Sequence, residues 1–180
     1  TKLSEKLMAD DKVYCGHISF GVTTNSYDAD GEIVSSLPVP LMTLEEINET
    51  AATFVGDQMQ EPPMVSAIKK NGVPLYKLAR KGIEVERKPR LIHIYRFRFT
   101  EYQEPVGAFR SACTKSTYVR SVAHDLGQKL GCGAHLTTLR RLVSGKFDVE
   151  DAMEYEELLN ISTADLEKRV IPMLQLAKDS

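Results

Sequence analysis

The sequence predicts an α+β fold built on a mainly antiparallel sheet. Extended segments rich in β-branched and aromatic residues occupy the middle of the chain. Helical patterns are interspersed among them without strict β-α-β alternation, which argues against a parallel sheet. The chain has 180 residues, 42% of them hydrophobic, which is enough for one substantial core.

The first elements are a strand and a hairpin signal. Residues 12–22, KVYCGHISFGV, read as a strand with Tyr14 near its start. In the following DADGEIV, Asp30-Gly31 is a dipeptide typical of tight hairpin turns. The sequence therefore predicts an early antiparallel pairing.

Residues 43–54 predict an amphipathic helix. Thr43 and Glu46 have the spacing of a capping box, in which each side chain bonds the backbone of the other residue. The apolar residues that share one face of this helix are Leu44, Ile47, Ala51 and Phe54.

A turn-rich excursion follows at residues 60–76, QEPPMVSAIKKNGVPLY. Pro62-Pro63 stiffen its start, and Asn71-Gly72 predicts a tight turn between two short extended pieces. Residues 75–82 then predict a short helix that ends at Gly82.

Two strands and a second main helix come next. Residues 89–100 and 106–113 are rich in β-branched and aromatic residues, and we expect them to pair as a hairpin. Residues 118–130 predict a helix, for which Ser116 or Thr117 would be the N-cap. Its core-facing stripe consists of Val119, Val122, Ala123, Leu126 and Leu130. Two short acidic helices, at 153–160 and 163–170, precede Pro172.

The charge distribution indicates where an anionic partner would bind. Residues 69–120 carry 13 Lys or Arg and 4 Asp or Glu, whereas residues 1–68 carry 3 and 11. Such a basic block can attract a polyanion locally although the net charge of the chain is only −2. The alternative is a solvated face whose charges only keep the protein soluble.

Several common chemistries find no support in the sequence. Neither GxxxxGK[ST] nor GxGxxG occurs, so no glycine-rich phosphate loop is predicted. Three cysteines without CxxC spacing indicate reduced thiols in a cytosolic protein rather than disulfides, and no apolar run has membrane-spanning length. The histidines lack the clustering that a metal site requires. These residues are Cys15, Cys113, Cys132, His17, His93, His124 and His135.

The start of the helix at 118–130 is a candidate anion site. Arg120 lies in its first turn, where free N–H groups and a partial positive charge already favour an anion. The guanidinium fork suits a carboxylate or a phosphate. The alternative is an ordinary exposed arginine on a helical first turn.

Three segments carry a resemblance to a known family. They are PPMVSAIK, KNGVPLYKLARKGIEVERKPR and KSTYVRSVAHDLGQKLGCGAHLTTLRRL. Together with KVYCGHISFGVTTNSYDADGEIV, they resemble the bacterial tRNA pseudouridine-55 synthase family, TruB. The similarity runs in the same order from Thr1 to about Pro172.

This resemblance implies a pseudouridine-synthase-like sheet with flanking helices and a thumb-like RNA-binding insertion at about 60–90. The catalytic domain would span 1–172 and a tail 173–180. Family members flip one uridine out of the T-arm of tRNA and isomerise it to pseudouridine, with an aspartate nucleophile and no metal or organic cofactor. The resemblance further implies a cytoplasmic monomer whose partner is tRNA.

The resemblance also assigns residues to roles. Tyr14 matches the tyrosine that packs on the flipped uracil, and Arg120 matches the arginine that pairs with the catalytic aspartate. Tyr118 and Leu139 match positions that line the uridine pocket. The residues that match RNA-gripping or cleft-approaching positions are Lys69, His135, Arg140 and Arg141.

The sequence departs from the family pattern in three places. The nucleophile segment, of the type GHxGTLDPxA, is absent upstream of Tyr14, so we expect the chain alone to be inactive. Asn25 stands where the family has an acidic residue, for which Asp28 or Asp30 would have to compensate. We also expect the chain to lack the small C-terminal RNA-binding domain that many bacterial members carry.

Two other functions remain open on sequence alone. A non-catalytic homologue that grips and remodels tRNA needs only the basic surface and base flipping. A soluble metabolic enzyme with an incidental basic face would show no salt-dependent binding to RNA, because phosphate contacts weaken as salt rises.

Overall fold

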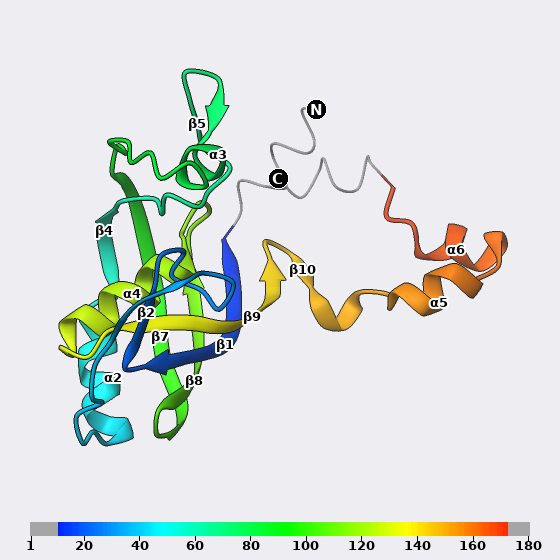
Figure 1. The fold of residues 1–180 in the computed structure, drawn as a ribbon. Helices are drawn as coiled ribbons and strands as arrows, with labels where there is room; N and C mark the ends of the chain where they lie inside the picture. Colours follow the sequence, from blue (N-terminus) through cyan, green and yellow to red (C-terminus); the bar gives the residue numbers. More distant parts are fainter. Residues whose placement is uncertain (1–10, 173–180) are drawn as a thin grey trace.

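The computed structural model describes residues 11–172, and its centre is a bent six-stranded sheet (Figure 1). The strand order is β10-β9-β1-β8-β7-β4, and every neighbouring pair is antiparallel. The predicted α+β class is therefore confirmed. The strands are β1 (Lys12–Phe20), β4 (Gly56–Gln60), β7 (Arg90–Gln103), β8 (Val106–Cys113), β9 (Ala134–Ser144) and β10 (Phe147–Asp148).

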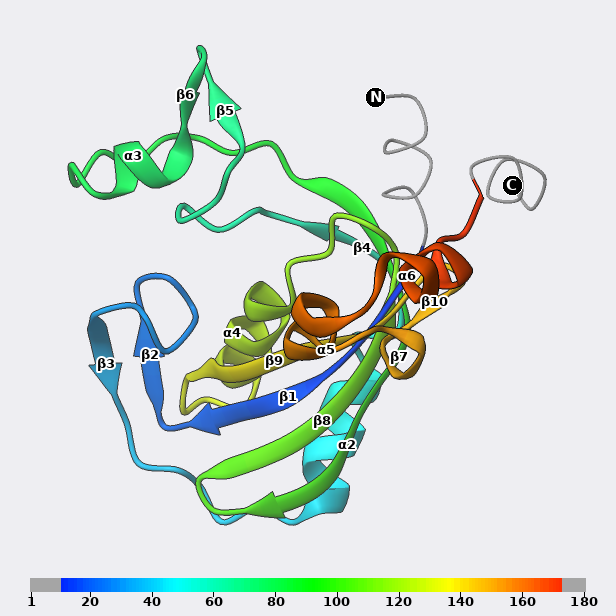
Figure 2. The same cartoon turned by 90° about the vertical axis from the view of Figure 1, so that its right-hand side faces the viewer.

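Two helices cover one face of the sheet. Helix α2 (Leu44–Ala52) packs on β7, and α4 (Val119–Lys129) packs on β9. Figure 2 views the opposite face, with both helices behind the strands. The core between the layers is rich in aromatic residues and includes Phe20, Phe97, Phe99, Phe109, Ile94 and Leu126.

The two helices begin differently. Helix α2 has the predicted capping box, since the Glu46 N–H donates to Thr43 Oγ1 at 3.2 Å and the Thr43 N–H donates to Glu46 Oε2 at 2.7 Å. For α4 the predicted N-cap, Ser116 or Thr117, is wrong. The N-cap is Tyr118, whose N–H donates to the side-chain oxygen of Gln60 at 2.8 Å. No side chain caps the first turn of α4, and Gln60 of β4 instead holds the backbone of the residue at which the helix begins.

The early hairpin has a longer connection than predicted. Strands β2 (Val22–Thr24) and β3 (Ile33–Ser36) pair, but residues 25–32 form a loop between them instead of a tight turn at Asp30-Gly31. An isolated bridge joins Asp28 in this loop to Leu136 of β9. The loop is therefore held against the main sheet.

Residues 61–89 form a lobe that stands away from the sheet, here called the hairpin lobe (Figures 1 and 2). It contains β5 (Lys69–Lys70), β6 (Val73–Pro74) and α3 (Leu75–Ala79). The predicted turn at Asn71-Gly72 is confirmed, with φ angles of 52° and 81°. At its base Arg87 pairs with Glu61 at 2.5 Å.

The last described elements are η1 (Val149–Asp151), α5 (Tyr155–Asn160) and α6 (Thr163–Arg169). The two helices confirm the predicted acidic pair, and they lie apart from the sheet (Figure 1). Within residues 11–172, no helix is both long and apolar enough to cross a membrane.

Candidate active site

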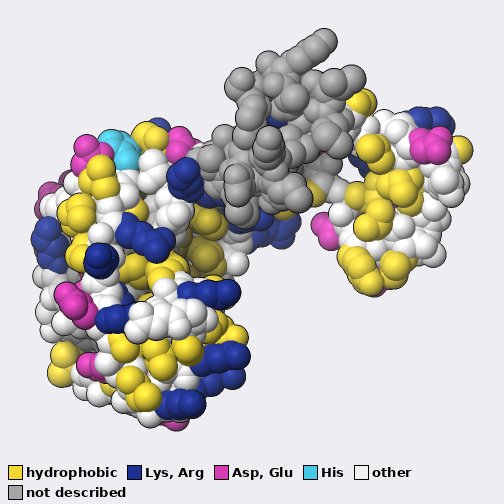
Figure 3. Space-filling model, turned by 90° about the horizontal axis from the view of Figure 1, so that it is seen from above, with side chains coloured by type: hydrophobic (Ala, Val, Ile, Leu, Met, Phe, Trp, Pro, Cys, Tyr) yellow, Lys and Arg dark blue, Asp and Glu magenta, His cyan; other side chains and the backbone are white. Residues whose placement is uncertain are grey.

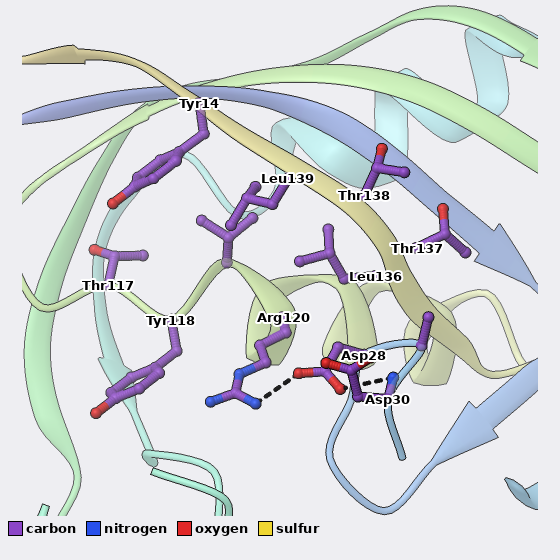
Figure 4. Close-up of a pocket in the computed structure, with 12 residues that line it drawn as sticks. Tyr14, Asp28, Asp30, Thr117, Tyr118, Arg120, Leu136, Thr137, Thr138 and Leu139 are labelled. Atoms are coloured by element: carbon purple, nitrogen blue, oxygen red, sulfur yellow. Dashed lines mark hydrogen bonds and ion pairs between the residues drawn. The ribbon is translucent and has the colours of Figure 1, made fainter. Parts of the chain in front are cut away.

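A pocket of about 340 Å³ opens between the sheet, the start of α4 and the loop 25–32 (Figure 4). It brings together four of the residues predicted from the sequence: Tyr14, Tyr118, Arg120 and Leu139. These positions are far apart in the chain, so the site exists only in the folded sheet. The other lining residues are Asp28, Ala29, Asp30, Thr117, Val119, Leu136, Thr137 and Thr138.

Tyr14 enters the pocket from β1 and is half-buried. Its cross-strand partner on β9 is Arg141. Burial raises the pKa of the Tyr14 hydroxyl above its ordinary value, while the nearby Arg141 guanidinium opposes the rise. The phenol is therefore protonated at neutral pH and presents both an aromatic ring and a hydroxyl donor.

Leu139 supplies an apolar wall next to this ring. This leucine is 45% exposed, and its side chain faces the pocket (Figure 4). Three positions earlier on the same strand, Leu136 is only 5% exposed. Leu139 is thus a lining residue rather than a core residue, and Tyr118 provides a second ring at the opposite rim.

The charged part of the site is an ion pair between Arg120 and Asp28. The Arg120 Nη1 donates to Asp28 Oδ2 at 2.7 Å, and both side chains are largely shielded, with exposures of 21% and 24%. The other carboxylate oxygen accepts from the Ser26 hydroxyl at 2.5 Å and from the Asp30 N–H at 3.3 Å. Both oxygens of the Asp28 carboxylate therefore have hydrogen-bond partners within the chain.

Arg120 also holds a third segment. Its Nη2 donates to the main-chain carbonyl of Val65 at 2.5 Å, and Nη1 lies 3.4 Å from the carbonyl of Ser26. The guanidinium therefore ties α4 to the loop 25–32 and to Val65 near the start of the hairpin lobe.

The loop 25–32 has its own internal hydrogen bonds. The Asn25 side-chain oxygen accepts from the Glu32 N–H at 3.1 Å, a contact that an aspartate could make equally well. The Thr24 hydroxyl donates to the Asp28 carbonyl at 2.7 Å. A Cβ at Gly31 would lie 2.2 Å from Ser26 Oγ, so the loop can close only around glycine. These contacts fix where the Asp28 carboxylate lies.

An aromatic stack anchors the same loop to α4. The rings of Tyr27 and His124 lie 3.9 Å apart and nearly parallel, at 18°. Tyr27 has a φ of 66°, which is rare for a bulky residue, and its carbonyl accepts from the Leu136 N–H at 3.0 Å. The surrounding contacts must offset this backbone strain.

Removing the stack should loosen the loop. We expect Tyr27→Ala to lower the free energy of unfolding by about 1–2 kcal/mol, because the ring contact is lost while the left-handed backbone remains. Tyr27→Phe keeps the stack and is the matched control, with a smaller effect. Urea unfolding of both variants measures the difference, and equal losses would show that the hydroxyl rather than the ring matters.

His124 should make stability depend on pH. Burial lowers its pKa below the ordinary value, so the unfolded chain takes up this proton first as pH falls. The stabilisation is complete above the unfolded pKa, about 6.5, and declines as pH drops below it. We expect His124→Phe, which retains a ring against Tyr27, to lose less stability than wild type between about pH 7.5 and pH 5.5. If the free energy of unfolding fell equally with pH in the variant and in the wild type, this assignment would be contradicted.

The remaining predicted residues lie outside the pocket lining. Lys69 is exposed on the hairpin lobe. His135 Nδ1 lies 3.0 Å from the carbonyl of Val22 and so bonds β9 to β2. Arg141 is beside Tyr14, whereas Arg140 is opposite Cys15, the next residue along β1, and therefore points to the other face of the sheet.

Sequence reasoning did not select Asp28 as a site residue. The sequence named it only beside Asp30 as a residue that would have to compensate for Asn25, and the carboxylate stands out only when α4 brings Arg120 to it. Thr137 and Thr138 were missed because no strand was predicted at 134–144. Among residues 11–172 no group of three His, Cys, Asp or Glu is arranged to hold a metal.

Comparison with known proteins identifies the family. The family model described as TruB family pseudouridylate synthase (N terminal domain) matches residues 1–119. The model described as tRNA pseudouridylate synthase B C-terminal domain matches residues 120–176. The boundary between the two falls at the start of α4, immediately before Arg120.

Similar proteins include tRNA pseudouridine synthase B of Opitutus terrae, 52% identical over 177 residues, which cover 98% of this chain and 73% of that protein. The protein of the same name from Dechloromonas aromatica is 43% identical over 173 residues, 96% of this chain and 58% of the relative. The chain thus spans little more than half the length of some relatives.

Among solved structures, the crystal structure of a Cbf5-Nop10-Gar1 complex contains a chain with the same fold. The TM-score is 0.66 at 22% identity, over 98% of this chain and 44% of the other. The sequence identity and the matched family models together show that this chain belongs to the TruB family of pseudouridylate synthases.

Proposed function

We propose that the protein isomerises the T-arm uridine of tRNA to pseudouridine, and that these 180 residues supply the base pocket and its arginine but not the nucleophile. The observation that carries the proposal is the pocket itself. A flipped base needs a planar platform, and stacking on an aromatic ring is worth about 1–3 kcal/mol per base. Tyr14 and Tyr118 offer rings, and Leu139 offers an exposed apolar surface.

The role proposed for Tyr14 agrees with its protonation state. A raised pKa keeps its hydroxyl neutral at physiological pH. The ring can then pack on uracil, and the hydroxyl can exchange a proton with the base through a hydrogen bond. The hairpin lobe, with Lys69 and Lys70 exposed, would grip the RNA stem.

Asp28 is poorly suited to be the nucleophile. Its carboxylate already accepts bonds from Arg120, Ser26 and the backbone of Asp30, and such bonds stabilise the charge that an attacking oxygen would have to share. We therefore assign it to holding Arg120 in place. The nucleophilic aspartate would come from outside the described residues and approach the same guanidinium.

Release of tritium from RNA labelled at C5 of uridine tests the function directly, since C5 loses its hydrogen when the new C–C bond forms. We expect the full-length protein to release tritium from a T-arm stem-loop, and the 180-residue chain to bind that RNA without releasing it. Turnover by the chain alone would show that the nucleophile lies within it.

A second function is favoured by one feature of the site. Arg120 already has a carboxylate partner within the chain, so the pocket is electrostatically complete without a further aspartate. A non-catalytic homologue that flips and remodels tRNA would need nothing more. In the tritium assay, a full-length protein that binds the stem-loop but releases no label would support this alternative.

A further inference from the structure

A row of arginines crosses the face of the sheet opposite the helices. In the strand registers Arg98 of β7 lies opposite Arg110 of β8, Arg110 lies opposite Cys15 of β1, and Cys15 lies opposite Arg140 of β9. All three arginines are exposed. We call Arg98, Arg110 and Arg140 the arginine row.

The neighbours of these arginines show which face they occupy. Phe97 and Phe99 on either side of Arg98 are 4% and 1% exposed in the core, and Phe109 next to Arg110 is 2% exposed. Since side chains alternate along a strand, the arginines point away from the core and the helices. The row thus lies behind the sheet relative to Tyr14 and Leu139.

The row is electrostatically unfavourable in the isolated molecule. Like charges directly opposite on antiparallel strands destabilise the pair. Within residues 11–172 none of the three guanidinium groups forms an ion pair or a hydrogen bond. On β7, the paired positions on either side of Arg98 on this face carry one acidic and one basic residue. They are Glu101, opposite Ala108, and Arg96, opposite Ala112. Folding alone does not account for this excess of positive charge.

The surface around the row suits an extended anion rather than a small ligand. The positions that flank the row are occupied by Ala108 and Ala112 on β8 and by Val13 and His17 on β1. The exposed His17 ring bonds to Thr138 Oγ1 of β9 at 2.7 Å, so these residues do not enclose a small molecule. Figure 3 shows Lys and Arg side chains gathered along the side of the main body that is turned toward the C-terminal helices. The patch is therefore open and linear.

We propose that the arginine row binds the phosphodiester backbone of RNA, at a surface separate from the pocket. Adjacent strands lie about 4.8 Å apart, so the row extends over about 14 Å. A nucleic-acid strand carries one phosphate per about 3.4 Å of helix axis, so enough phosphates lie along this length for all three arginines. The planar fork of arginine binds phosphate through two parallel hydrogen bonds.

The acidic helices of the same chain are the competing occupant. Tyr155–Asn160 carries Glu156 and Glu157, and Glu157 already pairs with Arg169 of α6 at 3.0 Å. Helix α5 also stands apart from the sheet. These observations favour RNA over the helices.

Salt-dependent binding of an oligouridylate of about 20 nucleotides, several times the length of the row, tests the proposal on the 180-residue chain. We expect the double variant Arg98→Gln, Arg110→Gln to bind about tenfold more weakly at low salt and to lower the slope of log K against log salt by about 1.4, or 0.7 per lost phosphate contact. The control, Lys168→Gln with Arg169→Gln on α6, also removes two positive charges and should keep the slope. If the arginine-row variant and the α6 control gave equal slopes, the proposal would be overturned, and the acidic helices would remain as the occupant of the row.

A charge reversal supplies a second readout. Arg98→Glu places opposite charges across the β7–β8 pair and should raise Tm by up to about 3 °C while it weakens oligouridylate binding. A fall in both Tm and oligouridylate affinity would show a structural role for Arg98 and contradict the proposal. Because the pocket is on the other face, loss of T-arm binding in Leu139→Asp tests the proposed function separately.

Discussion

Replacing Arg120 by alanine in the full-length protein is expected to lower turnover by about 10³-fold, the cost of removing one well-placed electrostatic group from an active site. Affinity for the T-arm stem-loop should change little, because the rings and the apolar wall of the pocket remain. Turnover should fall because this guanidinium is shielded and binds a carboxylate, with its Nη1 at 2.7 Å from Asp28 Oδ2.

Single-turnover tritium release and fluorescence anisotropy measure the two quantities independently. Arg120→Lys is the informative control, because it keeps the charge but loses the fork that reaches both Asp28 and the Val65 carbonyl. We expect an intermediate rate. If alanine reduced binding and turnover by the same factor, Arg120 would be a phosphate contact and the assignment would fail.

Gly127→Ala is expected to destabilise the protein by more than about 4 kcal/mol or to prevent folding. A Cβ at this position would lie 2.1 Å from the backbone nitrogen of Ala134 and 2.3 Å from the carbonyl carbon of Gly133. Neither backbone atom can move without separating α4 from β9. Urea unfolding, or the yield of soluble protein, measures the effect.

Gly131→Ala is the matched control for this substitution. Gly131 has a φ of 78°, but a Cβ added there would meet no atom within 4 Å, so alanine should cost only about 1–2 kcal/mol of backbone strain. Similar losses at the two positions would mean that the close approach of helix and strand is not what sets the geometry of α4.

The sequence predicts some elements well because their signals are local. Strand β7 alternates large apolar and polar residues from Ile92 to Phe99, and α2 carries its own capping box, so each could be assigned without its partners. Strand β9 could not, because TTLRRLVS mixes polar and apolar residues on both faces. One face lines the pocket and the other is exposed, so no apolar alternation marks it.

The difference between local signals and long-range contacts also explains which site residues could be predicted. Arg120 was singled out by its place at the helix start, the roles of Tyr14, Tyr118 and Leu139 came from a resemblance to a family, and the fold brings all four to one pocket. Asp28 could not be singled out among the acidic residues of its loop, since its importance depends on a contact with a residue 92 positions away. Interactions of this range are invisible to periodicity and turn chemistry.

The bond from Arg120 to the carbonyl of Val65 links the proposed active site to the hairpin lobe that would bind the RNA stem. A poorly fitting RNA that displaces the hairpin lobe would also move the Arg120 guanidinium out of position. If the proposed function holds, recognition by the lobe and chemistry at the base would be coupled through this side chain, and an incorrect substrate would react more slowly even where it binds.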